Sequence, residues 1–511
     1  MSSGDFHLLA FDSRFDTIFK ASKILHSRIE QIRNARAAAG DKNVNPTIPE
    51  IRSTHTLYVT GSYKPFVNIT SEYIKCDTRS NNQESLGANG DTLDITIPDT
   101  GYYLNDIVVN IVLPAIPASQ TTGVQFRYCA YPGIRIINQA HFRADGIAIA
   151  SYTSDDALLD SKFTVNKEQE NSFKRCMGQH IIRTAEYTGN CYTGIFQYSD
   201  GAQSLQTSQP ELNMWIPLKF WFCADPSQAL INNSTSASSE SRKITLKLEN
   251  AANIIRAYNS SGVDISSTEC ASIKYVANVY ANTLYVDPEI HKIIASRLTT
   301  TLIRTHKRAV IPMVAATGRL SLKELHFPAE YMFVGFRDTS TVTDFDHWCM
   351  FGRTTRPTTS GVSTIMAAAS VYNTGVGSAQ LVTRSCKESA SDTLEPIVTT
   401  VGLNICGSTI AFPNVNTSFF TNYLPNRYPL STLIHSPNDT SALFFPFDLY
   451  PGRDEVSGYL NLSSRNLTNA ELLYTSSYIS AQNRTQAIVS LRTINFLVHS
   501  STGSMQLKFN L

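Results

Sequence analysis

The sequence predicts an all-β chain made of two tandem jelly-roll β-sandwiches that follow a short N-terminal helical arm. After residue 50, short runs rich in Val, Ile, Thr, Tyr and Phe alternate with clusters of Gly, Pro, Asn and Ser, as in all-β domains. This pattern of strand-like runs occurs twice, in halves of roughly equal length that meet near Pro288. One amphipathic helix pattern precedes both halves, which predicts the arm.

The strand-like runs define the expected domains. Between Phe66 and Tyr285 there are about eight such runs, the number that one jelly roll needs. A second series begins near Pro288 and includes ASRLTTTLIRTHKRAVI, EYMFVGF and ALFFPFDLY. We therefore expect an arm at 1–46, a first jelly roll at 47–287 and a second at 288–511. We expect the pattern-poor stretches 166–210 and 338–440 to be elaborated connections at one end of each sandwich.

Local signals predict a turn, a corner and one aromatic strand. Asp145-Gly146 lies between FRA and IAIASY and predicts a two-residue hairpin, since type I′ turns need positive φ at both positions. Pro132-Gly133 breaks the strand pattern before IRII, as at a sandwich corner. The run LNMWIPLKFWFC is interpreted as one strand, so its two tryptophans, six positions apart, should both face the first core. In SGYLNLS, apolar and polar residues alternate as in a half-buried strand.

Residues 13–38 carry the helix pattern of the arm, and Gly40 with the following DKNVNPTIPE should end it. The helix either packs on its own domain or binds something outside it. Basic residues flank the apolar stripe, and Asp12, Asp16 and Glu30 dilute them, so membrane contact alone would be weak. We therefore favour an inward-facing anchor to the layer below. The apolar positions of this candidate anchor are Phe15, Ile18, Phe19, Ile24, Leu25, Ile29 and Ile32.

Composition excludes several classes of protein. Charged residues make up 17% of the chain, against about 25% in typical globular proteins, and the formal net charge is +1. Such balance gives no long-range attraction to nucleic acid, so we expect no direct nucleic-acid contact. No run approaches the roughly 20 apolar residues that span a bilayer, and the N-terminus does not resemble a secretory signal. The nine cysteines are scattered singly, which favours reduced thiols over a disulfide framework and provides no zinc site.

No motif for catalysis, cofactor binding or metal binding is present. HExxH, GxSxG and GxxxxGK[ST] are all missing, and His291 and His347 are interpreted as structural. The segment RTHKR at 304–308 would place Arg304, His306 and Arg308 on one face of a strand. Without interleaved aromatics this predicts a solvated or intersubunit face rather than a nucleic-acid site. We expect no enzyme, no cofactor and no metal.

A set of collinear segments resembles the major capsid proteins of nucleocytoplasmic large DNA viruses, in particular those of African swine fever virus and its relatives. The segments are FHLLAFD (6–12), THTLYVTGSYKPFVNITSEYIK (54–75), YPGIRIINQAHFRADGIAIASYTSD (131–155), LNMWIPLKFWFC (212–223), NTLYVDPEIHKIIASRLTTTLIRTHKRAV (282–310), LHFPAEYMFVGF (325–336), HWCMFG (347–352), PGRDEVSGYLNLSSRNLTNAELLY (451–474) and INFLVHSSTGSMQLKF (494–509). The turn and signature positions within them are Pro132, Gly133, Asp145, Gly146, Pro451, Gly452, Gly458 and Asn461.

The resemblance implies a structural protein of the virion. It implies a homotrimer whose six jelly rolls give a pseudo-hexagonal capsomer, and an icosahedral shell tiled by such capsomers. Neighbouring capsomers, penton and minor capsid proteins, and the inner viral membrane through the arm, are the partners to expect. Assembly in the host cytoplasm is also implied. The alternative is a β-sandwich that binds a receptor or carbohydrate, which would carry an aromatic platform on an exposed sheet and make no stable tiling contacts.

Overall fold

The computed structural model of the 511-residue chain describes every residue except 1–25, 28, 41–43, 48–68, 81–85, 87–90, 99, 122, 145, 180–183, 189–190, 196–206, 225, 232–241, 261–262, 271–272, 298–299, 326, 343–347, 356–392, 406–408, 429–433, 435–436, 438, 454, 463–469, 481–482, 500–504 and 509–511. Two compact units result. The smaller consists of Met1–Ser71 with Leu284–Leu298, and the larger of Glu72–Thr283 with Thr299–Leu511.

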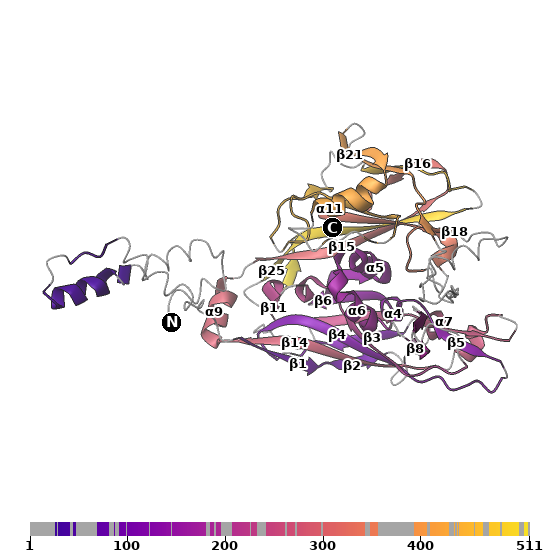
Figure 1. Ribbon diagram of the computed structural model, residues 1–511, viewed down its shortest axis with the longest axis horizontal. Helices are drawn as coiled ribbons and strands as arrows, with labels where there is room; N and C mark the ends of the chain where they lie inside the picture. The colour runs from indigo at the N-terminus through magenta and orange to yellow at the C-terminus, as the bar shows by residue number, and fades with distance from the viewer. Residues whose placement is uncertain are drawn as a thin grey trace. The chain divides into compact units, whose positions relative to one another are not determined.

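The first half of the chain folds into two main antiparallel sheets (Figure 1). One has the strand order β1 (Ile69–Lys75), β14 (Val276–Val286), β4 (Tyr103–Leu113) and β10 (Leu212–Pro217), with β11 (Leu230–Ile231) also beside β4. The other has the order β2 (Asp77–Ser80), β3 (Thr92–Thr96), β12 (Arg242–Leu248), β6 (Ile137–Ala144) and β7 (Ile147–Thr153). Alternate residues of β10 and β12 are buried, so each sheet turns one apolar face to the core.

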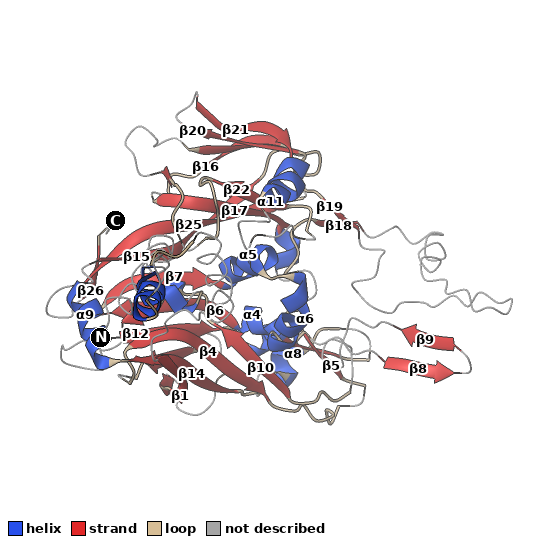
Figure 2. Cartoon of the chain, turned by 60° about the vertical axis from the view of Figure 1, so that its left-hand side comes forward, coloured by secondary structure: helices blue, strands red, loops and turns tan. Residues whose placement is uncertain are grey.

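The second half repeats this arrangement with the same strand order, except that the edge strand β2 has no counterpart (Figure 2). One sheet runs β15 (Thr300–Met313), β25 (Thr485–His499), β17 (Pro328–Asp338) and β22 (Ala442–Pro446), with β23 (Leu460–Asn461) on β17 and β26 (Met505–Leu507) on β25. The other runs β16 (Thr317–Ser321), β24 (Glu471–Thr475), β20 (Thr400–Ile405) and β21 (Thr409–Asn416). The predicted fold class, two groups of antiparallel sheets, is confirmed.

Shorter elements connect these strands. Three two-stranded pairs are β5 (Gln125–Tyr128) with β13 (Ile255–Tyr258), β8 (Thr184–Thr188) with β9 (Cys191–Ile195), and β18 (Arg353–Thr355) with β19 (Thr393–Glu395). The helices are α4 (Pro132–Ile136), α5 (Ser154–Thr164), α6 (Lys167–Cys176), η1 (Trp221–Cys223), η2 (Pro226–Gln228), α7 (Ala251–Ile254), α8 (Ser266–Glu269), α9 (Pro288–Arg297), η4 (Thr339–Val342), η6 (Phe419–Tyr423) and α11 (Leu424–Arg427).

The prediction that 166–210 and 338–440 are elaborated connections is wrong for part of the second stretch. The first stretch contains α6 and the β8–β9 pair. The second contains β20 and β21, which belong to a main sheet. In β20 five of the six residues are buried, so the strand shows no alternation of polar and apolar positions that would mark it in the sequence.

The prediction for the two tryptophans is wrong for Trp215. Strand β10 ends at Pro217, and Trp221 lies in the short helix η1, so strand alternation does not connect the two positions. Trp221 is fully buried, against Phe142 and Phe222. Trp215 lies on the outer face of β10 opposite Asn110 and is 43% exposed.

The arm is described only in part. Residues 26–27 and 29–38 are helical, in agreement with the C-terminal part of the predicted 13–38 helix. Gly40 has φ +74° directly after the helix, a left-handed conformation that glycine adopts at helix ends. The part of the predicted helix before residue 26 lies outside the described residues.

Candidate functional site

Helix α5 joins the two halves within the larger unit. It follows β7 directly, and the carboxylate of Asp156 accepts hydrogen bonds from the backbone N–H and the hydroxyl of Thr153, both at 2.9 Å, which fixes its start. Every residue of the helix is buried or half-buried. We call the contact of α5 and β7 with β15, β17 and β25 the seam.

Acidic residues of α5 meet basic residues of the second half across the seam. Asp155 forms ion pairs with Arg308 of β15 and with Arg337 of β17, the latter at 3.2 Å. Asp156 accepts a hydrogen bond from the hydroxyl of Ser490 on β25 at 2.6 Å. These contacts attach one helix to three neighbouring strands of the second half.

The burial of these charges shifts their protonation equilibria. Burial raises the pKa of Asp156, although hydrogen bonds from Ser490 and Thr153 and the charge of Arg308 oppose it. Burial also acts to raise the pKa of Asp160, but the charges of Lys219 and of the neighbouring basic groups outweigh it and hold the pKa below its usual value. Asp160 therefore stays ionised in its ion pair with Lys219, 3.0 Å away.

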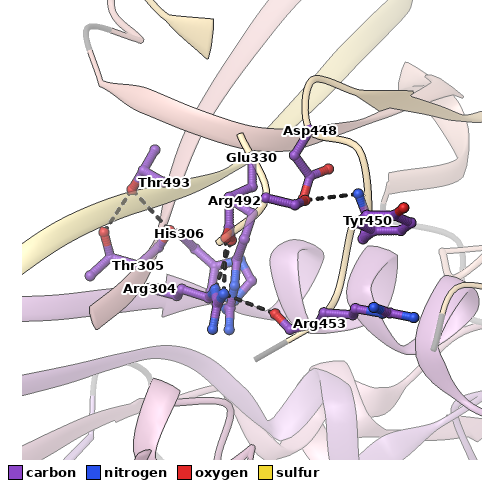
Figure 3. A network of polar contacts seen from close by, with 10 residues as sticks. Arg304, Thr305, His306, Glu330, Asp448, Tyr450, Arg453, Arg492 and Thr493 are labelled. Carbon is purple, nitrogen blue, oxygen red and sulfur yellow. Dashed lines mark hydrogen bonds and ion pairs between the residues drawn. The ribbon is translucent and has the colours of Figure 1, made fainter. Parts of the chain in front are cut away.

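Arg304 and Glu330 form a fully buried ion pair in the second half. The guanidinium donates to both carboxylate oxygens, at 2.7 and 3.0 Å, and also to the backbone carbonyl of Arg453 at 2.9 Å. Glu330 lies where the register between β17 and β25 shifts, so the ladder is irregular at the residue that carries this carboxylate. Figure 3 shows the pair beside Arg492 and His306.

His306 is a neutral acceptor in this network. Burial, and then the charge of Arg492, lowers its pKa to about 3. Arg492 donates to its Nε2 atom at 2.6 Å. On the other side of β15, the hydroxyls of Thr305 and Thr493 bond at 2.8 Å (Figure 3). The predicted alternation of RTHKR is confirmed, but the face of Arg304 and His306 is buried inside the chain and is neither solvated nor intersubunit.

Aromatic side chains fill the seam beside the charges. Phe163 of α5 stacks on Phe333 of β17, with ring centroids 4.4 Å apart and planes 4° apart, and lies 6.1 Å from Phe444 of β22. All three are buried. Tyr152 of β7 contacts the ring of His306 at 6.4 Å, and its hydroxyl oxygen accepts a hydrogen bond from the backbone of Lys219. The seam therefore combines ion pairs with apolar burial.

The loop after β22 is held by a small polar cluster. The hydroxyl of Ser457 donates to Asp448 at 3.1 Å and accepts from the backbone N–H of Tyr450 at 2.8 Å. Asp448 and Tyr450 are labelled in Figure 3. Burial, with a further contribution from the charge of Glu330, raises the pKa of Asp448 to about 7, against the opposing hydrogen bond from Ser457.

In the first half of the chain, burial raises the pKa of the Cys76 and Cys270 thiols to about 12.

These contacts hold the two halves of the larger unit together. Among the described residues, no three His, Cys, Asp or Glu side chains gather as a metal site would require. His306 is buried and neutral, with its Nε2 atom occupied by Arg492. None of the helices in the described part of the chain is long and apolar enough to cross a bilayer.

The predicted turn and signature positions lie apart from the seam network or at its edge. Pro132 begins α4, and a Cβ on Gly133 would meet the backbone of Met177 at 3.0 Å. Ala144 pairs with Ile147 across a two-residue connection in which Gly146 has φ +80°, while Asp145 lies outside the described residues. Further on, Gly452 has φ +84° after the turn residue Pro451, Gly458 approaches Asp448, and the exposed Asn461 pairs with Pro328. The structure does not bring these positions together as one site.

Of the candidate anchor residues, Ile29 and Ile32 lie in the described helix and are half-buried. The positions Phe15, Ile18, Phe19, Ile24 and Leu25 lie outside the described residues. The anchor function therefore stays a prediction.

The acidic residues of α5 are the functional residues that sequence patterns missed. The helix has no polar stripe, because both of its sides are covered, so helical periodicity does not reveal it. One signal was available. Thr153 followed three positions later by Asp156, just before Leu158 and Leu159, has the form of a capping box.

Comparisons with known sequences identify similar proteins along the whole chain. The protein-family model described as "Major capsid protein N-terminus" matches residues 58–287. The hexon protein p72 of African swine fever virus is 24% identical over 667 aligned residues that cover 100% of both chains. The major capsid protein of Phaeocystis pouchetii virus is 26% identical over 235 residues, which cover 44% of this chain and 42% of the relative.

Solved structures show the same fold. The Faustovirus major capsid protein superposes with a TM-score of 0.68 at 23% identity, covering 96% of this chain and 100% of the other. The capsid of PBCV-1 virus gives a TM-score of 0.62 at 15% identity, covering 88% of this chain and 99% of the other. Two groups of antiparallel sheets in one chain are therefore the double jelly-roll fold of these proteins.

Proposed function

We propose, from the premise that this chain belongs to the major capsid proteins of nucleocytoplasmic large DNA viruses, that three copies close into one capsomer with a pseudo-hexagonal outline. The chain is a structural subunit of the virion shell and assembles with other capsid subunits. Six similar sandwiches in a trimer would approximate a hexagonal tile, and such tiles would fill the flat facets of an icosahedral shell. Penton proteins would take the fivefold vertices, and assembly would take place in the host cytoplasm.

One observation carries this proposal. The second half repeats the strand order of the first, and α5 attaches the two through ion pairs and stacked rings. A chain with two similar sandwiches in a fixed relation can close a ring of six with only three copies. For the domains we propose an arm at 1–46, a first sandwich at 47–287 and a second at 288–511.

Native mass spectrometry of the purified full chain tests the trimer. We expect a species of three chain masses that persists on dilution, because trimers of this kind should bury more than about 2,000 Å². A chain that stays monomeric at high concentration would contradict the proposal.

For the arm we propose an anchor that ties the trimer to minor capsid proteins and, through them, to the inner membrane. Its support is the apolar stripe whose described members, Ile29 and Ile32, lie in a helix. Deleting residues 1–45 should leave thermal melting of the trimer unchanged and reduce the yield of shells. If the melting temperature of the truncated trimer falls strongly, the arm is part of a hydrophobic core. If shells form at full yield, the arm is not an anchor.

The carbohydrate-binding alternative retains one observation in its favour. The exposed Trp215 and the half-buried Tyr280 form an aromatic pair on the outer face of the β1-β14-β4-β10 sheet, with ring centroids 5.8 Å apart. An oligosaccharide stacked on this pair would quench or shift the fluorescence of Trp215. The absence of any change with a panel of oligosaccharides would remove this candidate.

A further inference from the structure

The seam is formed by a helix of the first half and a sheet face of the second half. The equivalent segment of the second half and the equivalent sheet face of the first half are not covered within the described part of the chain. In the first half, α5 follows β7 and covers the outer face of the second half's β15-β25-β17-β22 sheet. In the second half, η6 and α11 follow β21, the strand in the same place of the repeated order. The counterpart of the covered face is the outer face of the β1-β14-β4-β10 sheet.

The segment Phe419–Arg427, which we call the second-half ridge, presents aromatic and amide groups. Phe420 and Leu424 are buried, and Phe420 packs on Phe445 of β22 at 4.4 Å, which fixes the segment to its own sandwich. Phe419 and Tyr423 stack on each other at 5.2 Å, and Tyr423 is 52% exposed. They line an open groove together with Val415, Asn416, Ser418, Asn422 and Asn426. None of these groove residues is charged.

The middle of the outer face of the first half's sheet, a face that we call the Trp215 face, has the same chemistry. Trp215 contacts Tyr280, and opposite Trp215 in the ladder Asn110 donates a hydrogen bond to Asn213 at 2.5 Å. Asn282, two residues from Tyr280 on β14, is buried, and its Oδ1 atom has no hydrogen-bond partner among the described residues. Aromatic rings and amides therefore dominate the middle of this face.

Both faces carry an aromatic residue on the equivalent edge strands β22 and β10. On the covered face, Phe444 of β22 and Phe333 of β17 lie opposite each other and receive Phe163 of α5. On the Trp215 face, the equivalent strands β10 and β4 place Trp215 opposite Asn110. On the covered face, the group accepted is an aromatic side chain from a helix that follows the edge strand of the other sandwich.

We infer that the second-half ridge of one copy docks on the Trp215 face of the next copy, with Tyr423 placed against Trp215 as Phe163 is placed against Phe444 of the equivalent strand β22. This rests on the proposed homotrimer and names its contact surfaces. The two surfaces belong to different halves of the larger unit, since α11 lies beside β22 and the strands β1, β14, β4 and β10 lie on the side of the first half away from the second (Figure 1 and Figure 2). A head-to-tail contact that closes into a ring requires two different surfaces of this kind. A second copy is the occupant because both surfaces match in chemistry and repeat a junction already made inside the chain.

Tryptophan fluorescence tests the contact in the full chain. The sequence has three tryptophans, and Trp215 is the exposed one, since Trp221 and Trp348 are buried. Iodide should quench the Trp215 emission of the unassembled Tyr423→Asp variant and leave that of the wild-type trimer nearly unquenched. The Trp215→Phe variant lacks the Trp215 emission, so its difference from the wild-type spectrum shows which part of the fluorescence comes from Trp215. A wild-type trimer that is quenched as strongly as the unassembled variant overturns the inference, and also indicates a face free for another ligand.

Substitutions at the two surfaces provide the second measurement, since both side chains are exposed and should not be needed for folding. Trp215→Ala and Tyr423→Ala should each raise the trimer dissociation constant at least about tenfold, as truncated aromatic anchors do. Val263 is 56% exposed and belongs to neither surface, so Val263→Ala is the control and should leave the trimer dissociation constant unchanged. Combining Tyr423→Asp with Trp215→Arg should restore trimers that each single change prevents.

The outcomes separate the two proposals. If the wild-type chain never forms a trimer, the proposed function fails. If the wild-type trimer forms and the Trp215 and Tyr423 variants assemble with unchanged affinity, the docking surfaces are wrong while the homotrimer stands.

Discussion

Two segments of this chain hold the same place in their sandwiches and differ in chemistry. α5 follows β7, is covered on all sides, and carries Asp155 against two arginines and Asp156 against the hydroxyl of Ser490. The second-half ridge follows β21, leaves Tyr423 half-exposed, and lines its groove with uncharged side chains. The difference suggests that buried charge is used where the partner is always present, inside one chain.

The physical reason lies in desolvation. A buried ion pair is stable only when both charges and their hydrogen bonds are in place, and a lone buried charge is costly. Within one chain the partner of Asp155 is guaranteed. A surface that must also exist alone before assembly avoids that cost when it consists of aromatic and amide groups, which water tolerates and a partner can bury.

The largest effect that sharpens this comparison should come from breaking the Arg304–Glu330 pair. Glu330→Ala leaves the guanidinium of Arg304 buried without its carboxylate and should lower the free energy of unfolding by about 3–5 kcal/mol. Urea unfolding measures the loss. Arg319→Ala removes an ion pair with Glu471 whose arginine side chain is 67% exposed, and should cost less than about 1 kcal/mol. Equal losses in the two variants would show that burial does not govern these pairs.

A smaller effect should follow from Phe163→Leu at the seam. The change removes the ring that stacks on Phe333 and leaves a void between the two halves, so we expect a loss of about 1–3 kcal/mol in the free energy of unfolding. The matched change Phe419→Leu, at the partly exposed ridge, should cost less than Phe163→Leu in the isolated subunit. A larger loss at Phe419 would reverse the assignment of inner and outer segment.

The smallest effect should be a change in pH dependence at Asp448. Its pKa is raised from 3.8 to about 7, chiefly by burial, so the folded state holds this proton more tightly than the unfolded chain. The contribution of this group to stability is therefore full below about pH 4 and is lost as pH rises to about 7. Asp448→Asn should make the melting temperature less dependent on pH between 5 and 8. An unchanged pH profile would show that Asp448 is not protonated in the fold.

The sequence predicts those elements that bury one face and expose the other, and those turns that need a glycine. The two groups of sheets, the hairpin at Gly146 and the end of the arm helix at Gly40 all depend on alternation or on glycine geometry that is local. Along 457–462, Tyr459 is exposed and Leu462 is buried, as the alternating pattern indicates.

Elements that are buried on both sides were not predicted, because no solvated face alternates with a buried one. α5 and β20 lack a solvated face, so their residues show no period. Trp215 was placed in the core because the strand was extended past Pro217, where β10 ends. The partners of Asp155 lie more than 150 positions away along the chain, a distance that no local pattern spans.

The dependence of trimer stability on salt tests the distinction between charged inner and neutral outer contacts most directly. Sedimentation velocity of the full chain at about 0.1 and 1 M sodium chloride, where charge interactions are screened over roughly 10 and 3 Å, measures the trimer dissociation constant. We predict a dissociation constant that is unchanged or lower at high salt, because Tyr423 and the Trp215 face meet without ion pairs. A rise of more than about tenfold at 1 M would show that charges hold the copies together and would contradict this assignment.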